Sequence, residues 1–386
     1  MTQDILYHRP ALAERLSKLI MQVTVGSAAS SGVFLAAPRR TGKSTFARED
    51  LRPALEAAGA IVLYADLWKD LTKDPGEVIV EAIQEAVRRS EGFISRLAKA
   101  SGMDKVNVGG LSFNLDKIGL GKGIDLTQAL VALSDESKQM IVLIVDEAQH
   151  AITTDQGVAA LFALKAARDE LNSSKHHGLR IVCTGSNRDK LAMLRNSKDQ
   201  AFFGASMVQF PTLDEDFIEW FCANLDLQHP LDPSQVFPLF QESGYRPELL
   251  GAAADAIRFD FALPDKDIPV RFAALVRAQA DELNGNLKKV LHSLTPIQSA
   301  VIRVMSAKGE DYAPFEAATL ALYGKAMEQA GLDVGELTVE VPGVQQALIA
   351  LQEKKLVWKA SRGIYAVDEQ VIVELLRADG MLEGLG

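Results

Sequence analysis

A glycine, a lysine and a serine follow an apolar run near the N-terminus. Residues 33–46 read VFLAAPRRTGKSTF, so that four apolar residues lead into Ala37-Pro38-Arg39-Arg40-Thr41-Gly42-Lys43-Ser44, with Thr45 next. A small residue, four loop residues and Gly-Lys-Ser at the start of a helix form the pattern in which backbone N–H groups bind phosphate oxygens. The stretch predicts a phosphate-binding loop, in which Ala37 replaces the first glycine of the pattern.

Each residue type in this loop has its own task. Gly42 permits close approach of the backbone, Lys43 would reach the β- and γ-phosphates, and the Ser44 hydroxyl would bind Mg²⁺. The sequence contains no Asn-Lys-x-Asp guanine-binding motif, so ATP is expected by default. We therefore expect ATP and Mg²⁺ as cofactors, with residues 37–45 holding the nucleotide.

Two adjacent carboxylates end a second apolar run. IVLIVDEAQH starts at Ile141 and places Asp146 and Glu147 after five buried-strand residues. Parallel strands deliver such side chains to the carboxyl edge of a sheet. We assign Asp146 to the metal, through water, and Glu147 to the general base that polarises the attacking water. The alternative is a strand that ends in a solvated acidic turn.

A third apolar run ends in hydroxyl and amide side chains. LRIVCTGSNRDKL begins at Leu179 and carries Ser186 and Asn187 at its end, with Thr184 as a weaker candidate. Ser186 or Asn187 would orient the lytic water or sense the γ-phosphate. The same residues could instead cap the next helix.

The elements that position these residues alternate along the chain. Further strands are expected at 61–67 and 207–213, and helices at 10–24, 75–90 and 158–173. This order predicts an α/β core with a parallel sheet over residues 1–212. Residues 91–127 form an insertion, in which alternating apolar residues around glycine pairs suggest a β-hairpin.

The remainder predicts two appended domains. Residues 213–285 are helical, and Arg246 precedes a helix where a lid could bring its guanidinium to a bound phosphate; a solvated arginine before a helix that starts with proline is the alternative. Residues 286–386 read as three helices, a strand, a turn and a second strand, the order of a winged helix-turn-helix.

The winged helix has candidate DNA contacts but an acidic balance. Its third helix, about 344–354, and its wing carry amide and basic side chains at Gln345, Gln346, Gln352, Lys354, Lys355, Lys359 and Arg362. The basic residues could meet phosphates. Acidic residues outnumber basic ones across 286–386, so duplex DNA and a protein partner both remain open.

Composition excludes several classes of protein. The 386-residue chain is 48% hydrophobic and 24% charged, with a formal net charge of −10, which argues against a strongly basic nucleic-acid binder. Two cysteines, Cys183 and Cys222, suggest neither a disulfide framework nor a thiolate metal site. No apolar run approaches the ~20 residues that span a bilayer. Without a signal-peptide pattern, a cytoplasmic location is the default.

These motifs resemble those of archaeal-type P-loop ATPases of the AAA+/STAND group, relatives of the origin-recognition ATPases. The similar stretches are PRRTGKS, IVDEAQ, CTGSN and the C-terminal VQQALIALQEKKLVWKASRGIYAV, with a looser match at Leu6–Leu12. The resemblance implies an ATPase core, a helical lid and a winged helix. Such proteins often carry an arginine where this chain has Ala205; Arg188 and Arg195, just upstream, are possible substitutes.

The sequence thus predicts a slow Mg²⁺-dependent ATPase that acts as a nucleotide-driven switch or assembly factor. ATP binding is compatible with assembly into a homo-oligomer, and DNA association stays open. The alternative is a nucleotide-bound scaffold with negligible hydrolysis, whose winged helix docks protein partners. A kinase is disfavoured because nothing resembles a site for a small substrate.

Overall fold

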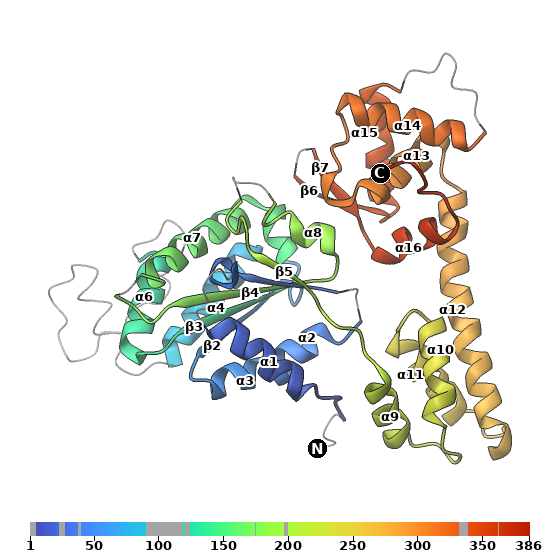
Figure 1. The fold of residues 1–386 in the computed structure, drawn as a ribbon, viewed down its shortest axis with the longest axis horizontal. Helices are drawn as coiled ribbons and strands as arrows, with labels where there is room; N and C mark the ends of the chain where they lie inside the picture. The colour runs from blue at the N-terminus through green and yellow to red at the C-terminus, as the bar shows by residue number, and fades with distance from the viewer. Residues whose placement is uncertain are drawn as a thin grey trace.

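The chain folds into an α/β core, a group of helices and a C-terminal part (Figure 1). The long helix α12 (Ile268–His292) connects the last two. The computed structural model describes the residues in the following ranges: 5–22, 28–37, 40–89, 119, 124–173, 175–196, 200–331, 339–361 and 363–386.

Five strands make one parallel sheet. They are β1 (Val33–Ala36), β2 (Ile61–Asp66), β3 (Ile141–Asp146), β4 (Leu179–Gly185) and β5 (Ser206–Gln209). Their order is β2-β3-β4-β1-β5, and every pair is parallel. The carboxyl ends therefore share one edge, where β4 lies between β1 and β3. This confirms the predicted sheet and brings the ends of the three motif-bearing runs together.

Helices cover both faces of the sheet. One face packs against α1 (Pro10–Met21), α2 (Lys43–Phe46), the π-turn η2 (Ala47–Leu51) and α3 (Arg52–Ala57). The other face packs against α4 (Pro75–Arg89), α6 (Leu126–Ser137) and α7 (Asp155–Leu171). Side chains of β1 alternate between the two apolar clusters, Phe34 joining one and Leu35 the other, as the two-residue period of a strand requires.

Short helices complete the core. They are η1 (Ala28–Ser31), η4 (Ala148–Thr153) and α8 (Arg188–Ala192). Both η4 and α8 begin directly after the carboxyl ends of strands, β3 and β4 respectively. They therefore lie at the edge where the predicted site residues gather.

The helical part has its own apolar cluster. The elements of this part are α9 (Glu215–Asn224), α10 (Pro233–Glu242), α11 (Pro247–Arg258), η5 (Asp265–Asp267) and the first half of α12. The apolar cluster is formed between these α-helices. Tyr7 joins this cluster from the N-terminal segment, with its ring centroid 5.3 Å from that of Phe217 and 5.4 Å from that of Trp220. The boundary expected near residue 285 falls inside α12, which runs on without interruption.

The C-terminal part has the predicted order of elements. It contains α13 (Pro296–Lys308), η6 (Gly309–Asp311), α14 (Ala317–Gln329), α15 (Val341–Glu353), β6 (Val357–Ser361), β7 (Ile364–Val367) and α16 (Gln370–Ala378). Strands β6 and β7 pair antiparallel, and Gly363 in the turn has φ 82°, which glycine tolerates best. The sequence did not predict α16.

Several element ends differ from the prediction. The last strand stops at Gln209 rather than at 213. Pro211 has no N–H to donate to a ladder, and the Arg9 guanidinium donates instead to the carbonyls of Pro211 and Thr212, at 2.9 and 3.2 Å. Helix α7 starts earlier than expected because the Thr154 hydroxyl accepts from Gly157 N. The hairpin predicted within 91–127 lies almost wholly outside the described residues. In the part of the chain that the structure describes, no helix is long and apolar enough to cross a membrane.

Candidate functional site

The predicted loop leaves β1 and enters a continuous helical run. Gly42 caps the run with φ 78°, and helical structure continues from Lys43 through α2, η2 and α3 to Ala57. Arg40 also has a positive φ, 65°. Pro38 and Arg39 lie outside the described residues. A left-handed residue before a helix turns the chain so that its first N–H groups face outward, the geometry in which such loops bind phosphate.

Lys43 reaches the carboxylate edge of the sheet. Its side chain is only 4% exposed, and its Nζ lies 3.9 Å from Glu147 Oε1. A cavity of about 330 Å³ opens here, and we call it the P-loop cavity. Its lining residues are Arg40, Gly42, Lys43, Ser44, Thr45, Arg48, Asp66, Trp68, Asp146 and Glu147. The fold therefore brings five of the predicted loop residues, Arg40 and residues 42–45, into one cavity with both predicted carboxylates.

Asp146 is held by hydroxyls from both neighbouring strands. The Tyr64 hydroxyl on β2 donates to Asp146 Oδ2 at 2.7 Å, and the Thr184 hydroxyl on β4 donates to Oδ1. Burial, with the charge of Asp146 next, raises the pKa of Tyr64, so Tyr64 stays a donor. Thr184 thus orients Asp146, the predicted metal ligand, whereas the sequence made Thr184 a weaker candidate for a sensor.

Glu147 lies in a strained backbone position and makes several contacts. Its φ of 53° and ψ of 45° are left-handed, a conformation that non-glycine residues adopt mainly where the surroundings impose it. Its Oε2 accepts from Ser186 Oγ at 2.9 Å and from Gln149 Nε2 at 2.5 Å. The structure brings together the predicted base, the predicted sensor Ser186 and Lys43.

This donor set fits a magnesium–nucleotide complex. Mg²⁺ is usually held by one or two protein oxygens, by phosphates and by water. Ser44 and Asp146 line the same cavity, and no group of three or more metal-ligating His, Cys, Asp or Glu occurs within the described residues. A site of few ligands beside a buried lysine is suited to a metal that arrives with a phosphate chain.

Asn187 is directed away from this cavity. Its Oδ1 accepts from Lys190 N at 3.1 Å and so caps α8, and its Nδ2 donates at 2.9 Å to the carbonyl of Val367 on β7. The capping alternative from the sequence is thus realised at Asn187. Ser186 and Asn187 are adjacent in the chain, but Ser186 contacts Glu147, the predicted base, and Asn187 contacts the C-terminal part.

A buried ion pair strengthens the same contact. Lys190 Nζ lies 2.6 Å from Asp368 Oδ1 and 5.1 Å from the centre of the Trp358 ring. The Lys190 side chain is 3% exposed and the Asp368 side chain is 21% exposed. Helix α8, which follows β4, therefore carries the lysine that pairs with Asp368, the residue directly after β7.

Arg246 does not line the P-loop cavity in this structure. It caps α11, and its charge acts on Glu374 of α16. Burial raises the pKa of Glu374, and Arg246 and Arg377 oppose this rise. The loop does contact α11 through an exposed ion pair, with Arg40 Nη1 3.3 Å from Glu248 Oε1. Nucleotide contact by Arg246 remains a prediction.

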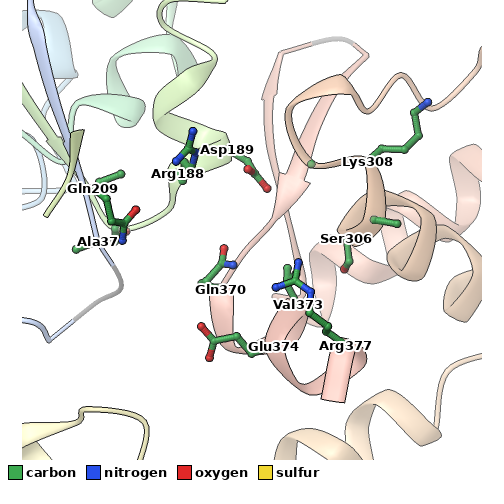
Figure 2. Close-up of a pocket in the computed structure, with 14 residues that line it drawn as sticks. Ala37, Arg188, Asp189, Gln209, Ser306, Lys308, Gln370, Val373, Glu374 and Arg377 are labelled. Carbon is green, nitrogen blue, oxygen red and sulfur yellow. The ribbon is translucent and has the colours of Figure 1, made fainter. Parts of the chain in front are cut away.

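A second cavity of about 330 Å³ lies between the core and the C-terminal part (Figure 2). Ala37 and Ser186 line its core side, so it begins where the predicted loop starts and where β4 ends. Figure 2 shows Gln370 and Glu374 of α16 on the side that faces the core. Burial, with Glu310 adding to it, raises the pKa of Asp189 here, and Arg188 opposes the rise.

Similar proteins often carry an arginine, called the arginine finger, where this chain has Ala205. The two arginines suggested as its substitutes have other contacts. Arg188 Nε lies 3.3 Å from Glu310 Oε1 of η6, and Arg195 Nε donates to the carbonyl of Ala205 at 2.5 Å. Neither lines the P-loop cavity.

Sequence reasoning missed three residues that line the P-loop cavity, Arg48, Asp66 and Trp68. It also missed Tyr64, whose hydroxyl donates a hydrogen bond to Asp146. Two signals could have found Tyr64, Asp66 and Arg48. Tyr64 and Asp66 are two residues apart on a strand and share a face, and Arg48 follows Ser44 by four residues, one helical turn.

The candidate DNA contacts are exposed where they are described. Gln345, Gln346, Lys354, Lys355 and Lys359 are exposed, whereas Gln352 is half-buried and donates to the carbonyl of Leu348. Arg362 lies outside the described residues. The surface of α15 and the start of the wing are therefore open to a partner.

Comparisons with known proteins agree with this architecture. No protein-family model matches the chain, and no curated protein matches its sequence. Among solved structures it is similar to the Walker-type ATPase paby2304 of Pyrococcus abyssi, at 15% identity over 96% of each chain with a TM-score of 0.51. It is also similar to the ADP form of the Aeropyrum pernix ORC2 protein, at 15% identity over 99% of this chain and 96% of that chain, with a TM-score of 0.52.

These likenesses define the class of fold. The chain has the AAA+-type P-loop NTPase fold, with a five-stranded parallel sheet followed by helices and a C-terminal winged helix. The resemblance that the motifs predicted is confirmed at the level of the fold.

Proposed function

We propose that this chain is a slow Mg²⁺-dependent ATPase that works as a nucleotide-driven switch or assembly factor. One observation carries the proposal: the buried Lys43 ammonium lies 3.9 Å from Glu147 in a cavity that also holds Ser44 and Asp146. A buried lysine beside carboxylates, at the start of a helix, is an arrangement that a phosphate chain and its metal would complete.

In this proposal each residue has one task. Lys43 and the backbone N–H groups of residues 37–45, apart from Pro38, which has no backbone N–H, hold phosphates. Ser44 and Asp146 hold the metal. Mg²⁺, when bound, neutralises phosphate charge. Glu147 accepts the proton of the attacking water. Ser186 donates a hydrogen bond to Glu147 in this structure. In the complex it orients the attacking water or contacts the γ-phosphate.

The switch role is supported by the neighbouring tasks of Ser186 and Asn187. A shift of Ser186 on nucleotide binding would move the next residue, whose amide donates to Val367 of the winged helix. We propose the division into a core (1–212), a helical lid (213–285) and a winged-helix domain (286–386). Because α12 is continuous across the second boundary, lid and winged helix would move together.

The scaffold alternative also has a specific observation in its favour. Glu147 accepts from Ser186 and Gln149 and lies beside Lys43, and position 205 is alanine. A base held by three neighbours and a missing finger residue would both slow hydrolysis.

The test separates binding from turnover. Lys43→Ala should abolish ATP binding in titration calorimetry, whereas Lys18→Ala, which removes a surface lysine paired with Glu14, should leave binding unchanged. Glu147→Gln should keep binding and slow hydrolysis by roughly 10²–10⁴-fold, the usual contribution of a general base. Unchanged affinity in Lys43→Ala would remove the proposal. Equal turnover in Glu147→Gln and the unmodified chain would favour the alternative, a nucleotide-bound scaffold with negligible hydrolysis.

The partner of the winged helix is tested separately. If it is duplex DNA, Lys354, Lys355, Lys359 and Arg362 supply phosphate contacts, and binding weakens steeply with salt. Lys355→Glu with Arg362→Glu should then remove a low-salt mobility shift, whereas the same charge change in the lid, Lys266→Glu with Arg271→Glu, should not. No shift for the unmodified chain, with or without ATP, would point to a protein partner. Sedimentation with and without ATP tests for a homo-oligomer.

A further inference from the structure

Arg48 lies beside Asp66 in the wall of the P-loop cavity, one helical turn after Ser44. It belongs to the π-turn η2, which joins α2 to α3 within the helical run that follows the loop. Single π-turns inside helices occur frequently at functional sites. Arg48 and Ser44 line the same cavity as Asp146 and Glu147. The sequence motif assigns no task to Arg48.

The contacts of Arg48 are weak enough to be exchanged. Its guanidinium lies over the Tyr64 ring at 5.6 Å, and its Nη2 is 3.8 Å from Asp66 Oδ2. That separation exceeds a hydrogen bond, and the Arg48 side chain is 50% exposed. An exposed pair of this kind is screened by water and contributes little. Moving the guanidinium toward a phosphate would therefore cost little.

The charges that line the P-loop cavity are compatible with a role for the Arg48 guanidinium at the phosphate. Its lining carries three cations (Arg40, Lys43 and Arg48) and three carboxylates (Asp66, Asp146 and Glu147). Arg40 pairs with Glu248 of the lid. When water attacks the γ-phosphorus, the bond to the bridging β–γ oxygen breaks, the water proton passes to Glu147, and ADP and inorganic phosphate form. Negative charge then builds on the transferred group and its leaving oxygen.

The other arginines considered for this task are engaged elsewhere. Arg188 pairs with Glu310, Arg195 donates to the Ala205 carbonyl, and Arg246 acts on Glu374. Of the arginines in the described residues, Arg40 and Arg48 are the two that line the P-loop cavity. Arg48 is the one that lies beside Asp66 and Tyr64, and the Tyr64 hydroxyl in turn donates to Asp146.

We propose that Arg48 supplies, from within the same chain, the cation that stabilises charge on the transferred phosphoryl group, and so replaces a finger residue that position 205 lacks. The inference rests on the proposed ATPase function. An arginine suits this role because its planar donors bind two oxygens at once and it does not lose its proton.

The test uses a transition-state mimic in addition to turnover. ADP with Mg²⁺ and fluoroaluminate imitates the phosphoryl group in flight, so its affinity relative to ADP reports stabilisation of that charge. Arg48→Ala should bind ADP·Mg²⁺ as the unmodified chain does, lose the added affinity from fluoroaluminate, and hydrolyse ATP about 10³-fold more slowly. Arg48→Lys should keep only part of the affinity gain from fluoroaluminate and only part of the hydrolysis rate. Arg52→Ala, one turn further along and paired with Glu56, should change neither.

Asp66→Asn distinguishes catalysis from a structural pair. If Arg48 matters only because it pairs with Asp66, both variants lose the fluoroaluminate gain equally; the proposal requires the loss in Arg48→Ala alone. Retention of that gain and of turnover in Arg48→Ala, or no gain in the unmodified chain, would overturn the inference and leave ATP binding standing. If the unmodified chain binds neither ADP nor ATP, the proposed function fails as well.

Discussion

Removing the charge of Asp368 should weaken the contact between the winged helix and the core. Asp368 accepts from Lys190 at 2.6 Å, and the Lys190 side chain is 3% exposed. Asp368→Asn removes the carboxylate that faces this buried ammonium. Loss of one member of a buried pair typically costs about 3–5 kcal/mol. Because the Asp368 side chain is 21% exposed, water reaches the site, and we expect about 2–3 kcal/mol.

The two ends of the pair should not be equivalent. Lys190→Met removes the buried charge and leaves a carboxylate that water can reach, so it should cost only about 1 kcal/mol. The double variant should be about as stable as Lys190→Met, because without the ammonium Asp368→Asn no longer breaks an ion pair. The resulting coupling has a magnitude of about 2–3 kcal/mol, within the range for residues in contact.

Urea unfolding of the two single variants and the double variant measures this coupling. The control is Asp379→Asn: Asp379 pairs with Lys288 at 2.8 Å, but both side chains are about a third exposed, so the loss should stay below about 1 kcal/mol. Additive single losses, or an Asp368→Asn variant as stable as the unmodified chain, would refute the claim that this pair holds the winged helix on the core.

Three further predictions follow from single side chains. Tyr64→Phe removes a donor to Asp146 and should weaken magnesium-dependent nucleotide binding about 10-fold, as measured by magnesium titration. The raised pKa of Asp189, from an ordinary value of 3.8, means that its contribution to stability is present below 3.8 and is lost as the pH rises through the raised value; Asp189→Asn should flatten this loss in thermal unfolding across that window. Burial raises the pKa of Cys183, and burial with Asp232 raises that of Cys222 to about 11, so neither thiol should react with a disulfide reagent at neutral pH until the chain unfolds.

Each of these has an outcome that contradicts it. An unchanged magnesium midpoint in Tyr64→Phe would show that the hydroxyl does not position Asp146. Parallel stability curves for Asp189→Asn and the unmodified chain would show that this carboxyl titrates alike in the folded and unfolded states. Rapid labelling of a cysteine in the native chain would indicate a local opening of its surroundings.

The sequence by itself determined the sheet and the loop. Residues 33–46, Asp146 with Glu147, and Ser186 occur in short runs whose apolar period and turn residues depend on neighbours a few positions away. Parallel strands then leave little choice, since their carboxyl ends must meet at one edge. Hence the structure brings Lys43 and Glu147 within 3.9 Å, although about a hundred residues separate them.

Only the tertiary structure decided how the remaining polar groups are used. Asn187 and Ser186 look equivalent in sequence, but the winged helix, docked on α8, takes the amide of Asn187 and leaves Ser186 with Glu147. Lys190 and Asp368 are 178 positions apart, and no local pattern couples them. Such partners depend on how separately folded elements pack, because a side chain's hydrogen bonds are set by what lies opposite it in space.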